Sequence, residues 1–321
     1  MSRAVRAMSS VVSPAGPRAK LLTFFFHRVL ERPDPMIPGE MHAAQFDEAL
    51  GWIGDQFRVL HPLDACERLA AGTLPARAAI ISFDDGYRDN HDVALPLLKK
   101  HRMQAAFFVA TGYLGDGVQF NDRLTEALRA HRGSAFDATW LGLGSLPTGD
   151  LPVRLQTLHR LREGVKYLPP AERNAALERI ESACGLPASR SGRDRIMMTP
   201  EEVQALAAEG MEIGGHTVMH PILKSVDDDT AFEEIRAGRA ALSALLPRPP
   251  RLFAYPNGKL GTDFDPRHAD MARRAGFSWA FSTQRGVAHA RSDRMMLPRF
   301  MPWDKQALRF KLQALKVLLG R

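Results

Sequence analysis

The sequence predicts an α/β protein: a distorted barrel of parallel strands and helices that carries a helical insertion and a C-terminal helix. Two observations lead to this fold class. Apolar runs of strand length alternate with helical patterns through most of the chain, which is typical of a parallel sheet wound by crossovers. The number of such units favours closure of the sheet into a barrel, and 321 residues suffice for one barrel domain.

The predicted sheet consists of strand-length apolar runs, which lie at residues 20–27, 78–83, 105–110, 211–215, 252–255, 279–282 and 296–300. Helices are predicted over 42–57 and 90–100. The helix before residue 211 is marked most clearly. Thr199 is its predicted N-cap, Glu202 completes a capping box, and Gly210 ends it.

The chain is predicted to divide into a tail, a barrel and a terminal helix. Residues 1–19 contain no acid and are rich in Arg, Ser, Ala and Pro, so they are predicted to form a disordered basic tail. The barrel covers 20–303. Within it, residues 112–199 lack convincing strands and are predicted to form a mostly helical insertion and not a separate domain. Residues 304–321 are predicted to form an amphipathic helix.

Leucines recur at helical spacing in the C-terminal segment. Leu308, Leu312, Leu315 and Leu319 are predicted to share one face of the helix. The favoured interpretation is a helix that covers the barrel with this face. Because the segment is basic, an interfacial helix in peripheral contact with a membrane is the alternative.

Composition and charge exclude several classes of protein. Hydrophobic residues make up 45% and charged residues 25% of the chain, which is the balance of a soluble globular protein. The net charge of +7 is scattered and aromatic residues reach only 8%, so a nucleic-acid-binding surface is not expected. Cys66 and Cys184 form no CxxC pair, which argues against a disulfide scaffold. No apolar run reaches the length of a membrane-spanning helix or forms a secretory signal, so the predicted location is the cytoplasm.

Two adjacent carboxylates follow a strongly apolar predicted strand. Asp84 and Asp85 lie in the segment Ser82-Phe83-Asp84-Asp85-Gly86-Tyr87. Neighbouring carboxylates at a strand end repel each other and are costly to bury unless a cation or a donor compensates them. The structural alternative is an Asp-Asp-Gly turn that caps the next helix.

A pair of histidines follows another predicted strand. His216 and His220 are four residues apart in Gly215-His216-Thr217-Val218-Met219-His220-Pro221. This spacing lets both imidazoles reach one metal ion if the segment turns helically. Two ordinary surface histidines are the alternative.

An arginine and a tight turn flank a third predicted strand. Arg251 precedes the apolar residues, and Pro256-Asn257-Gly258 follows them. Arg251 is expected either to pair with a surface acid or to orient a catalytic carboxylate through a bidentate contact.

Together and in this order, the three segments resemble the signatures of the NodB-like polysaccharide deacetylases, carbohydrate esterase family 4. The family patterns are (T/S)FDDG, H(S/T)xxHP and an RxxxxPxG-like segment, and the first two match at every defining position. The resemblance extends from about residue 20 to 300 in motif order. It implies a distorted (β/α) barrel of the NodB-homology type.

The resemblance also implies roles for individual residues. Asp84 is similar to the general base, and the metal ligands would be Asp85, His216 and His220. The expected cofactor is a divalent ion, with Zn²⁺ first and Co²⁺, Ni²⁺ or Fe²⁺ as alternatives, because two imidazoles and one carboxylate leave open positions for catalysis. Arg251 would hold Asp84 in place, and the backbone N–H of Asn257 would stabilise the oxyanion.

The sequence departs from the family pattern near its end. The family has a Leu-x-His motif whose histidine protonates the leaving amine, whereas this chain has Leu297-Pro298-Arg299-Phe300. Arginine cannot deliver a proton near neutral pH. His27, at the end of the first predicted strand, resembles the strand-end histidine of the biofilm poly-N-acetylglucosamine deacetylases and is the candidate acid. Arg299 would then pair with Asp84 or bind substrate.

Two aromatic residues are weaker candidates for contact with a sugar. Tyr87 and Trp303 are expected to stack on the substrate, although Tyr87 would equally pack beneath the metal loop.

The function that the resemblance implies is metal-dependent hydrolysis of N-acetyl groups on an amino-sugar glycan, releasing acetate. The glycan partner would be a polysaccharide, an oligosaccharide or a lipid-linked precursor. Two other functions remain open: deacylation of a small non-glycan amide, and glycan binding without catalysis.

Overall fold

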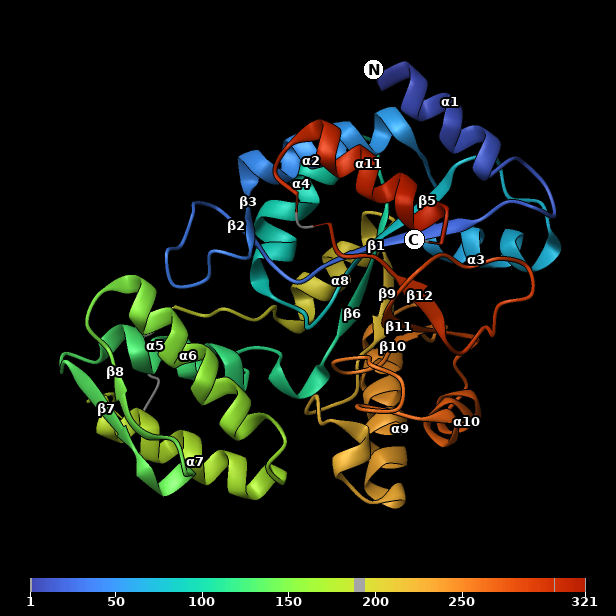
Figure 1. Ribbon diagram of the computed structural model, residues 1–321. Coiled ribbons are helices and arrows are strands. Elements are labelled where there is room, and N and C mark those ends of the chain that lie inside the picture. The colour runs from blue at the N-terminus through green and yellow to red at the C-terminus, as the bar shows by residue number, and fades with distance from the viewer. Residues whose placement is uncertain (1, 188–193, 303, 321) are drawn as a thin grey trace. The chain divides into compact units, whose positions relative to one another are not determined.

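A computed structural model describes residues 2–187, 194–302 and 304–320. Its centre is a parallel sheet in the order β1-β5-β6-β9-β10-β11-β12, with β4 beside β5 (Figure 1). The strands are β1 (Leu21–Phe26), β4 (Arg58–Val59), β5 (Ala78–Phe83), β6 (Ala105–Val109), β9 (Glu212–Gly215), β10 (Leu252–Ala254), β11 (Trp279–Arg285) and β12 (Leu297–Arg299). Each of the strand-length runs predicted from the sequence forms a strand.

The first and last strands lie next to each other and nearly close the sheet. The Phe25 N–H donates to the Phe300 carbonyl at 3.1 Å, and the Phe300 N–H donates to the Thr23 carbonyl at 2.8 Å. The prediction of an α/β barrel is therefore confirmed. Closure matters for function, because the carboxyl ends of parallel strands all meet at one rim of a barrel.

The strands are buried on both faces and alternate between two hydrophobic clusters. Phe24 and Phe83 point toward the covering helices, whereas Leu21, Ile80 and Phe108 point into the barrel. This two-residue period explains why the strands read as continuous apolar runs in the sequence.

Helices surround the strands of the barrel. They are α2 (Ala43–Gln56), α3 (Pro62–Ala71), α4 (Leu95–Lys100), α8 (Pro200–Ala208), α9 (Asp228–Leu245) and α10 (Pro266–Arg274). The capping box of α8 forms as predicted: Thr199 Oγ1 accepts from the Glu202 N–H, and Glu202 accepts from the Thr199 N–H. Shorter elements are β2 (Val29–Leu30), β3 (Met41–His42), a π-helical turn over Asn90–Ala94, and 3₁₀ turns over Thr111–Tyr113 and Leu223–Ser225.

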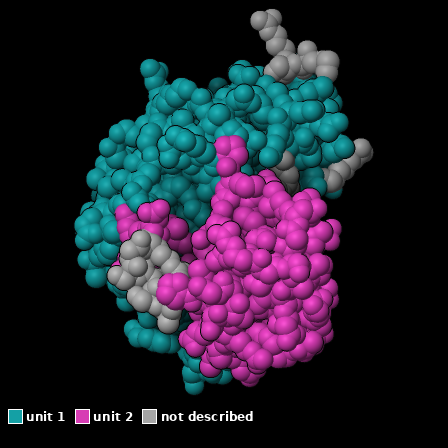
Figure 2. All heavy atoms as spheres, turned by 90° about the vertical axis from the view of Figure 1, so that its left-hand side faces the viewer, with its two compact units in different colours: residues 1–32, 39–115, 197–321 teal, residues 33–38, 116–196 magenta. Residues whose placement is uncertain are grey.

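Residues 33–38 and 116–196 form a second compact unit (Figure 2). It contains α5 (Phe120–Ala130), α6 (Leu151–Lys166), α7 (Pro170–Ala183), a 3₁₀ turn over Thr139–Leu141, and an antiparallel hairpin of β7 (Ala135–Ala138) and β8 (Gly144–Pro147). The prediction of a mostly helical segment at 112–199 missed this hairpin, whose strands are short and whose turn depends on glycines with positive φ. The unit has its own apolar core, so it is more independent than the predicted insertion.

The N-terminal segment differs from the prediction of a disordered tail. Residues Ser2–Val12 form helix α1, which packs against α2 and α11 (Ala307–Leu318). Val5 and Ser9 are buried, and the amide of Gln56 donates to Ser9 Oγ and to the Lys311 carbonyl. The lack of acids suggested disorder, but apolar side chains at helical spacing and these paired polar groups hold the helix in place.

Helix α11 covers the barrel, but with a different face from the predicted one. Phe310 is buried, stacks on Phe24 at 5.8 Å and meets Trp52 edge-on at 5.5 Å. Leu315 is also buried, whereas the other leucines of the predicted stripe are more than a third exposed: Leu308, Leu312 and Leu319. The aromatic contacts of Phe310 bury more apolar area than a leucine would, and they fix the rotation of the helix.

One prediction concerns Glu212, which begins β9 at the amino-terminal rim. Its side chain is mostly buried and lies 3.6 Å from His61 Nε2. Burial raises the pKa of Glu212 to about 7, although Arg251 acts against the shift. The folded protein thus keeps a proton that the unfolded chain loses, so native stability falls as the pH rises from about 4.5 to about 7.

The variant Glu212→Gln should therefore match the wild type near pH 4 and exceed its unfolding free energy by up to about 3 kcal/mol above pH 7. Urea unfolding across this pH range measures the difference. Glu48→Gln is the control, because Glu48 lies at an exposed position of α2. A gain that does not change with pH would contradict the expectation.

Candidate active site

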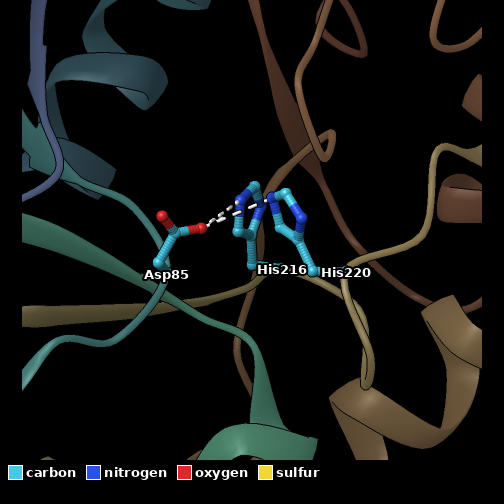
Figure 3. Close-up of side chains that lie close together, drawn as sticks. All are labelled: Asp85, His216 and His220. Atoms are coloured by element: carbon cyan, nitrogen blue, oxygen red, sulfur yellow. Dashed lines mark ion pairs between the residues drawn. The ribbon is translucent and has the colours of Figure 1, made fainter. Parts of the chain in front are cut away.

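The three predicted metal-binding residues converge at the carboxyl ends of two parallel strands, β5 and β9, which are separated in the sheet by β6. Asp85 follows β5, and His216 and His220 lie in the loop after β9. Nε2 of His216 lies 3.5 Å from Asp85 Oδ1, and Nε2 of His220 lies 3.4 Å from the same oxygen (Figure 3). The candidate ligand atoms all lie within 4.8 Å of one another.

This arrangement fits a divalent cation. Asp85 Oδ1 is buried and has no hydrogen-bond donor in the described part of the chain, which is costly for a carboxylate oxygen. Nδ1 of His216 lies 2.7 Å from the Ala254 carbonyl, an outer contact that directs Nε2 toward Asp85. A cation placed among the three side chains would compensate the orphaned oxygen.

The charges of the cluster agree with this interpretation. Burial acts to raise the pKa of Asp85, but other contributions, led by the contact with His216, outweigh it, so the pKa is lowered and the carboxyl is ionised. Burial lowers the pKa of His220 to about 4, so its imidazole is neutral at neutral pH. For His216 the two carboxylates outweigh burial and raise the pKa, and a bound cation would displace that proton.

The turns that carry these side chains have strained backbones. Among the described non-glycine residues, six have positive φ, and four of them lie in the predicted motifs: Asp85, Thr217, His220 and Asn257. Such conformations are costly and persist only where the surroundings enforce them.

Helix α9 supports the histidine turn. The carboxylate of Glu234 accepts from the N–H groups of Val218 and Met219 at 2.9 and 2.8 Å. Gly238 permits the close approach, since a Cβ there would lie 2.8 Å from the Thr217 carbonyl. Sequence reasoning missed Glu234, because no spacing rule links a helical glutamate to a loop sixteen residues earlier.

Asp84 is buried and held by Arg299. Nη1 of Arg299 donates to Oδ1 at 2.7 Å and Nη2 donates to Oδ2 at 2.8 Å, a bidentate pair. Burial acts to raise the pKa of Asp84, but the Arg299 guanidinium outweighs it and the carboxyl stays ionised. Of the two alternatives for Arg299, the structure favours pairing with Asp84.

Arg251 does not hold Asp84, which corrects the expectation from the motif. Its Nη1 pairs with Glu67 at 2.7 Å, and both side chains are about half-exposed. The reason is strand direction: Arg251 precedes β10 and Asp84 follows β5, so they lie at opposite rims of a parallel barrel. The surface-pair alternative was the correct one.

His27 follows β1 at the same rim as the cluster. It is half-buried, and the amide of Asn90 fixes its backbone by donating to its carbonyl at 2.9 Å. A charge on His27 contributes to lowering the pKa of both Asp84 and Asp85, after the contributions of burial and of their direct partners. Because β1 and β5 are neighbouring parallel strands, His27 lies at the same rim as Asp84 and Asp85, which follow β5.

The remaining candidates differ in accessibility. Asn257 follows β10 with φ of 59°, and its N–H forms no hydrogen bond with the described residues. Tyr87 is only 4% exposed, and the Arg28 guanidinium lies 4.7 Å from its ring centre, which favours packing beneath the metal loop over stacking on a sugar. Trp303 lies outside the described residues.

A second group of possible ligands lies at the surface. His91 Nδ1 is 2.9 Å from Asp92, and Arg88 pairs with the other oxygen of Asp92 at 2.7 Å. Glu202 of the same group accepts from the Thr199 N–H in the capping box. Because these acids are already compensated, the geometry favours the buried cluster as the functional centre.

Comparison with known proteins identifies a family. The family model described as polysaccharide deacetylase matches residues 71–134 and 178–280, just over half of the chain. Over 110 residues the chain is 30% identical to YxkH of Bacillus subtilis (strain 168), whose name places it among polysaccharide deacetylases. The match covers 34% of this chain and 37% of YxkH.

Solved structures share the fold over nearly the whole chain. One is the Streptococcus pyogenes deacetylase PplD, solved in complex with acetate, with a TM-score of 0.61 and 19% sequence identity. The match covers 92% of this chain and 98% of PplD. IcaB from Ammonifex degensii has a TM-score of 0.57 at 19% identity, with 98% of IcaB and 93% of this chain covered. At such identities the likeness establishes the fold. With the family model, it follows that the chain belongs to the polysaccharide deacetylase family, with a barrel of the NodB type.

Proposed function

We propose that the protein is a metal-dependent hydrolase that removes acetyl groups from the N-acetylated amino sugars of a glycan. One observation carries the proposal. An orphaned, buried oxygen of Asp85 faces two imidazoles, and beside it the carboxylate of Asp84 is held in a fixed orientation. This pairing of a cation site with a second, oriented carboxylate suits hydrolysis of an amide by water.

The cation site would be formed by Asp85, His216 and His220. Two nitrogens and one oxygen suit Zn²⁺ first, and such sites also accept Co²⁺, Ni²⁺ or Fe²⁺. When bound, the ion lowers the pKa of water and polarises a carbonyl group.

Asp84 would act as the general base. Arg299 keeps the carboxylate ionised and fixes its plane, so it accepts a proton from water in a defined direction. The Asn257 N–H would donate to the oxygen of the acetamide carbonyl as negative charge develops there. Its lack of a partner among the described residues leaves this donor available.

His27 would act as the general acid. A C–O bond forms between water and the acetyl carbon and the C–N bond breaks, so the departing nitrogen must gain a proton. His27 follows β1 at the rim that carries both carboxylates, and histidine is the residue type most often used for proton transfer in catalysis. The products are acetate and the free amine of the sugar.

The proposed function predicts metal-dependent release of acetate. Metal-stripped protein should be inactive on chito-oligosaccharides and regain activity with added Zn²⁺, Co²⁺ or Ni²⁺. Asp84→Asn should lower the rate about a hundredfold or more while metal affinity persists, because general-base catalysis contributes that much. Tight metal binding without acetate release from any N-acetylated glycan would instead favour a non-catalytic glycan-binding protein.

A second prediction concerns the acid. His27→Ala should lower turnover by about a hundredfold or more and leave metal affinity unchanged, because His27 is not among the ligand atoms. His159→Ala, at an exposed position of α6, is the matched control. Acetate release and metal titration are measured on both variants, and unchanged turnover in His27→Ala would exclude the assignment.

A third prediction concerns the pairing of Arg299 with Asp84. Removing either partner leaves an uncompensated buried charge, so Arg299→Met and Asp84→Asn should each cost about 3 to 5 kcal/mol of unfolding free energy. The double variant should cost clearly less than the sum of the two, because both charges are then removed.

Urea unfolding of the four proteins in this double-mutant cycle measures the coupling. Arg236→Met is the control and should change stability by less than about 1 kcal/mol, since its pair with Glu233 on α9 is exposed. Additive effects of the two buried substitutions would refute the coupling.

A further inference from the structure

Helix α11 exposes apolar and basic side chains on one surface. Leu308, Leu312 and Leu319 are 38%, 40% and 44% exposed. Arg309 and Lys316 are exposed as well. Successive residues of an α-helix are about 100° apart around its axis, so these five side chains span roughly 100° of the helix circumference. The three leucines lie on one side of this span and the two basic residues on the other. The side chain of α11 that packs against the barrel, Phe310, is not among these five.

Helix α1 adds a second exposed apolar face. Met8 is 52% and Val11 is 80% exposed, and the exposed residues Ala4 and Ala7 lie on the same side of the helix. Helices α1 and α11 pack against each other, and Figure 1 shows both near the chain termini that it marks. We call the exposed side chains Met8, Val11, Leu308, Leu312, Leu319, Arg309 and Lys316 the terminal-helix patch.

The terminal-helix patch is cationic. The sequences of α1 and α11 contain no acidic residue. Arg309 and Lys316 form no ion pair with any residue that the structure describes. The nearby acids are engaged, since Asp55 pairs with Lys311 and Asp304 accepts from the amide of Gln313. A partner for this surface must therefore offer negative charge next to an apolar phase.

We infer that the terminal-helix patch docks the protein onto the surface of an anionic phospholipid bilayer. Exposed leucines beside uncompensated cations match the boundary between acyl chains and phosphate groups. The two helices would lie on the bilayer, because none of the described helices is long and apolar enough to span it. The inference rests on this surface alone and is independent of the proposed chemistry.

The experiment is co-sedimentation of the full chain with lipid vesicles. One set is pure phosphatidylcholine, and the other contains about one third phosphatidylglycerol, which supplies the anionic surface. We expect binding to the anionic vesicles, weaker binding at high salt, and little binding to phosphatidylcholine.

Two paired variants separate the contributions. Leu308→Ser with Leu312→Ser should lower the partition coefficient at least about tenfold. The control is Leu151→Ser with Leu260→Ser, at leucines that are 40% and 36% exposed elsewhere.

Arg309→Glu with Lys316→Glu should lower binding roughly fivefold for each lost cation. Arg132→Glu with Arg291→Glu makes the same change of net charge at other exposed positions and should have a smaller effect.

Circular dichroism and thermal melting verify that each variant folds. Failure of the wild type to bind anionic vesicles overturns the inference, and so does equal loss of binding in patch and control variants. The other outcome is a dimer of the wild type in sedimentation experiments, absent in the leucine variant, with no vesicle binding by the wild type. That outcome would identify a second copy of the chain as the partner of this surface and would also overturn the inference.

Discussion

The buried guanidinium of Arg299 joins the closure of the barrel to the candidate active site. Arg299 is fully buried at the end of the last strand, where an unpaired charge would be prohibitively costly. Its Nε donates to the Ser282 carbonyl of β11, and its two Nη atoms donate to the carboxylate of Asp84, which follows β5. It also lies 4.6 Å from the ring centre of Phe25 on β1. A single side chain thus contacts strands on both sides of the closure, and its charge requires Asp84 to remain ionised.

The second constraint is backbone strain at the carboxyl rim. Asp85, Thr217, His220 and Asn257 adopt conformations that side chains disfavour, and the cost must be met by contacts outside the motifs. For the histidine turn those contacts come from Glu234 of α9, which binds two consecutive N–H groups. The histidine turn therefore depends on a helix whose sequence shows no functional signature.

Much of the fold and part of the site could be predicted from the sequence. The strands of the barrel were identifiable because they are buried on both faces, and the convergence of Asp85 with the two histidines followed from their places after parallel strands. Arg251 was misjudged although the information was present, since a residue before a strand cannot meet one that follows a parallel strand. The partner of Arg299, the support from Glu234 and the rotation of α11 depend on contacts across the molecule. Periodicity in one segment does not contain that information.

The ends of the first and last strands are neighbours, which bears on the late segment Leu297-Pro298-Arg299-Phe300. Phe300 and Phe25 are hydrogen-bonded neighbours, so side chains at the ends of β12 and β1 reach adjacent space. With Arg251 at the opposite rim, a histidine at position 299 would leave Asp84 without its bidentate cation. Arg299 supplies that cation, and under the proposed function the proton donor would come from the neighbouring strand end. His27 follows β1 at that strand end, and β1 pairs with β5, the strand that Asp84 and Asp85 follow.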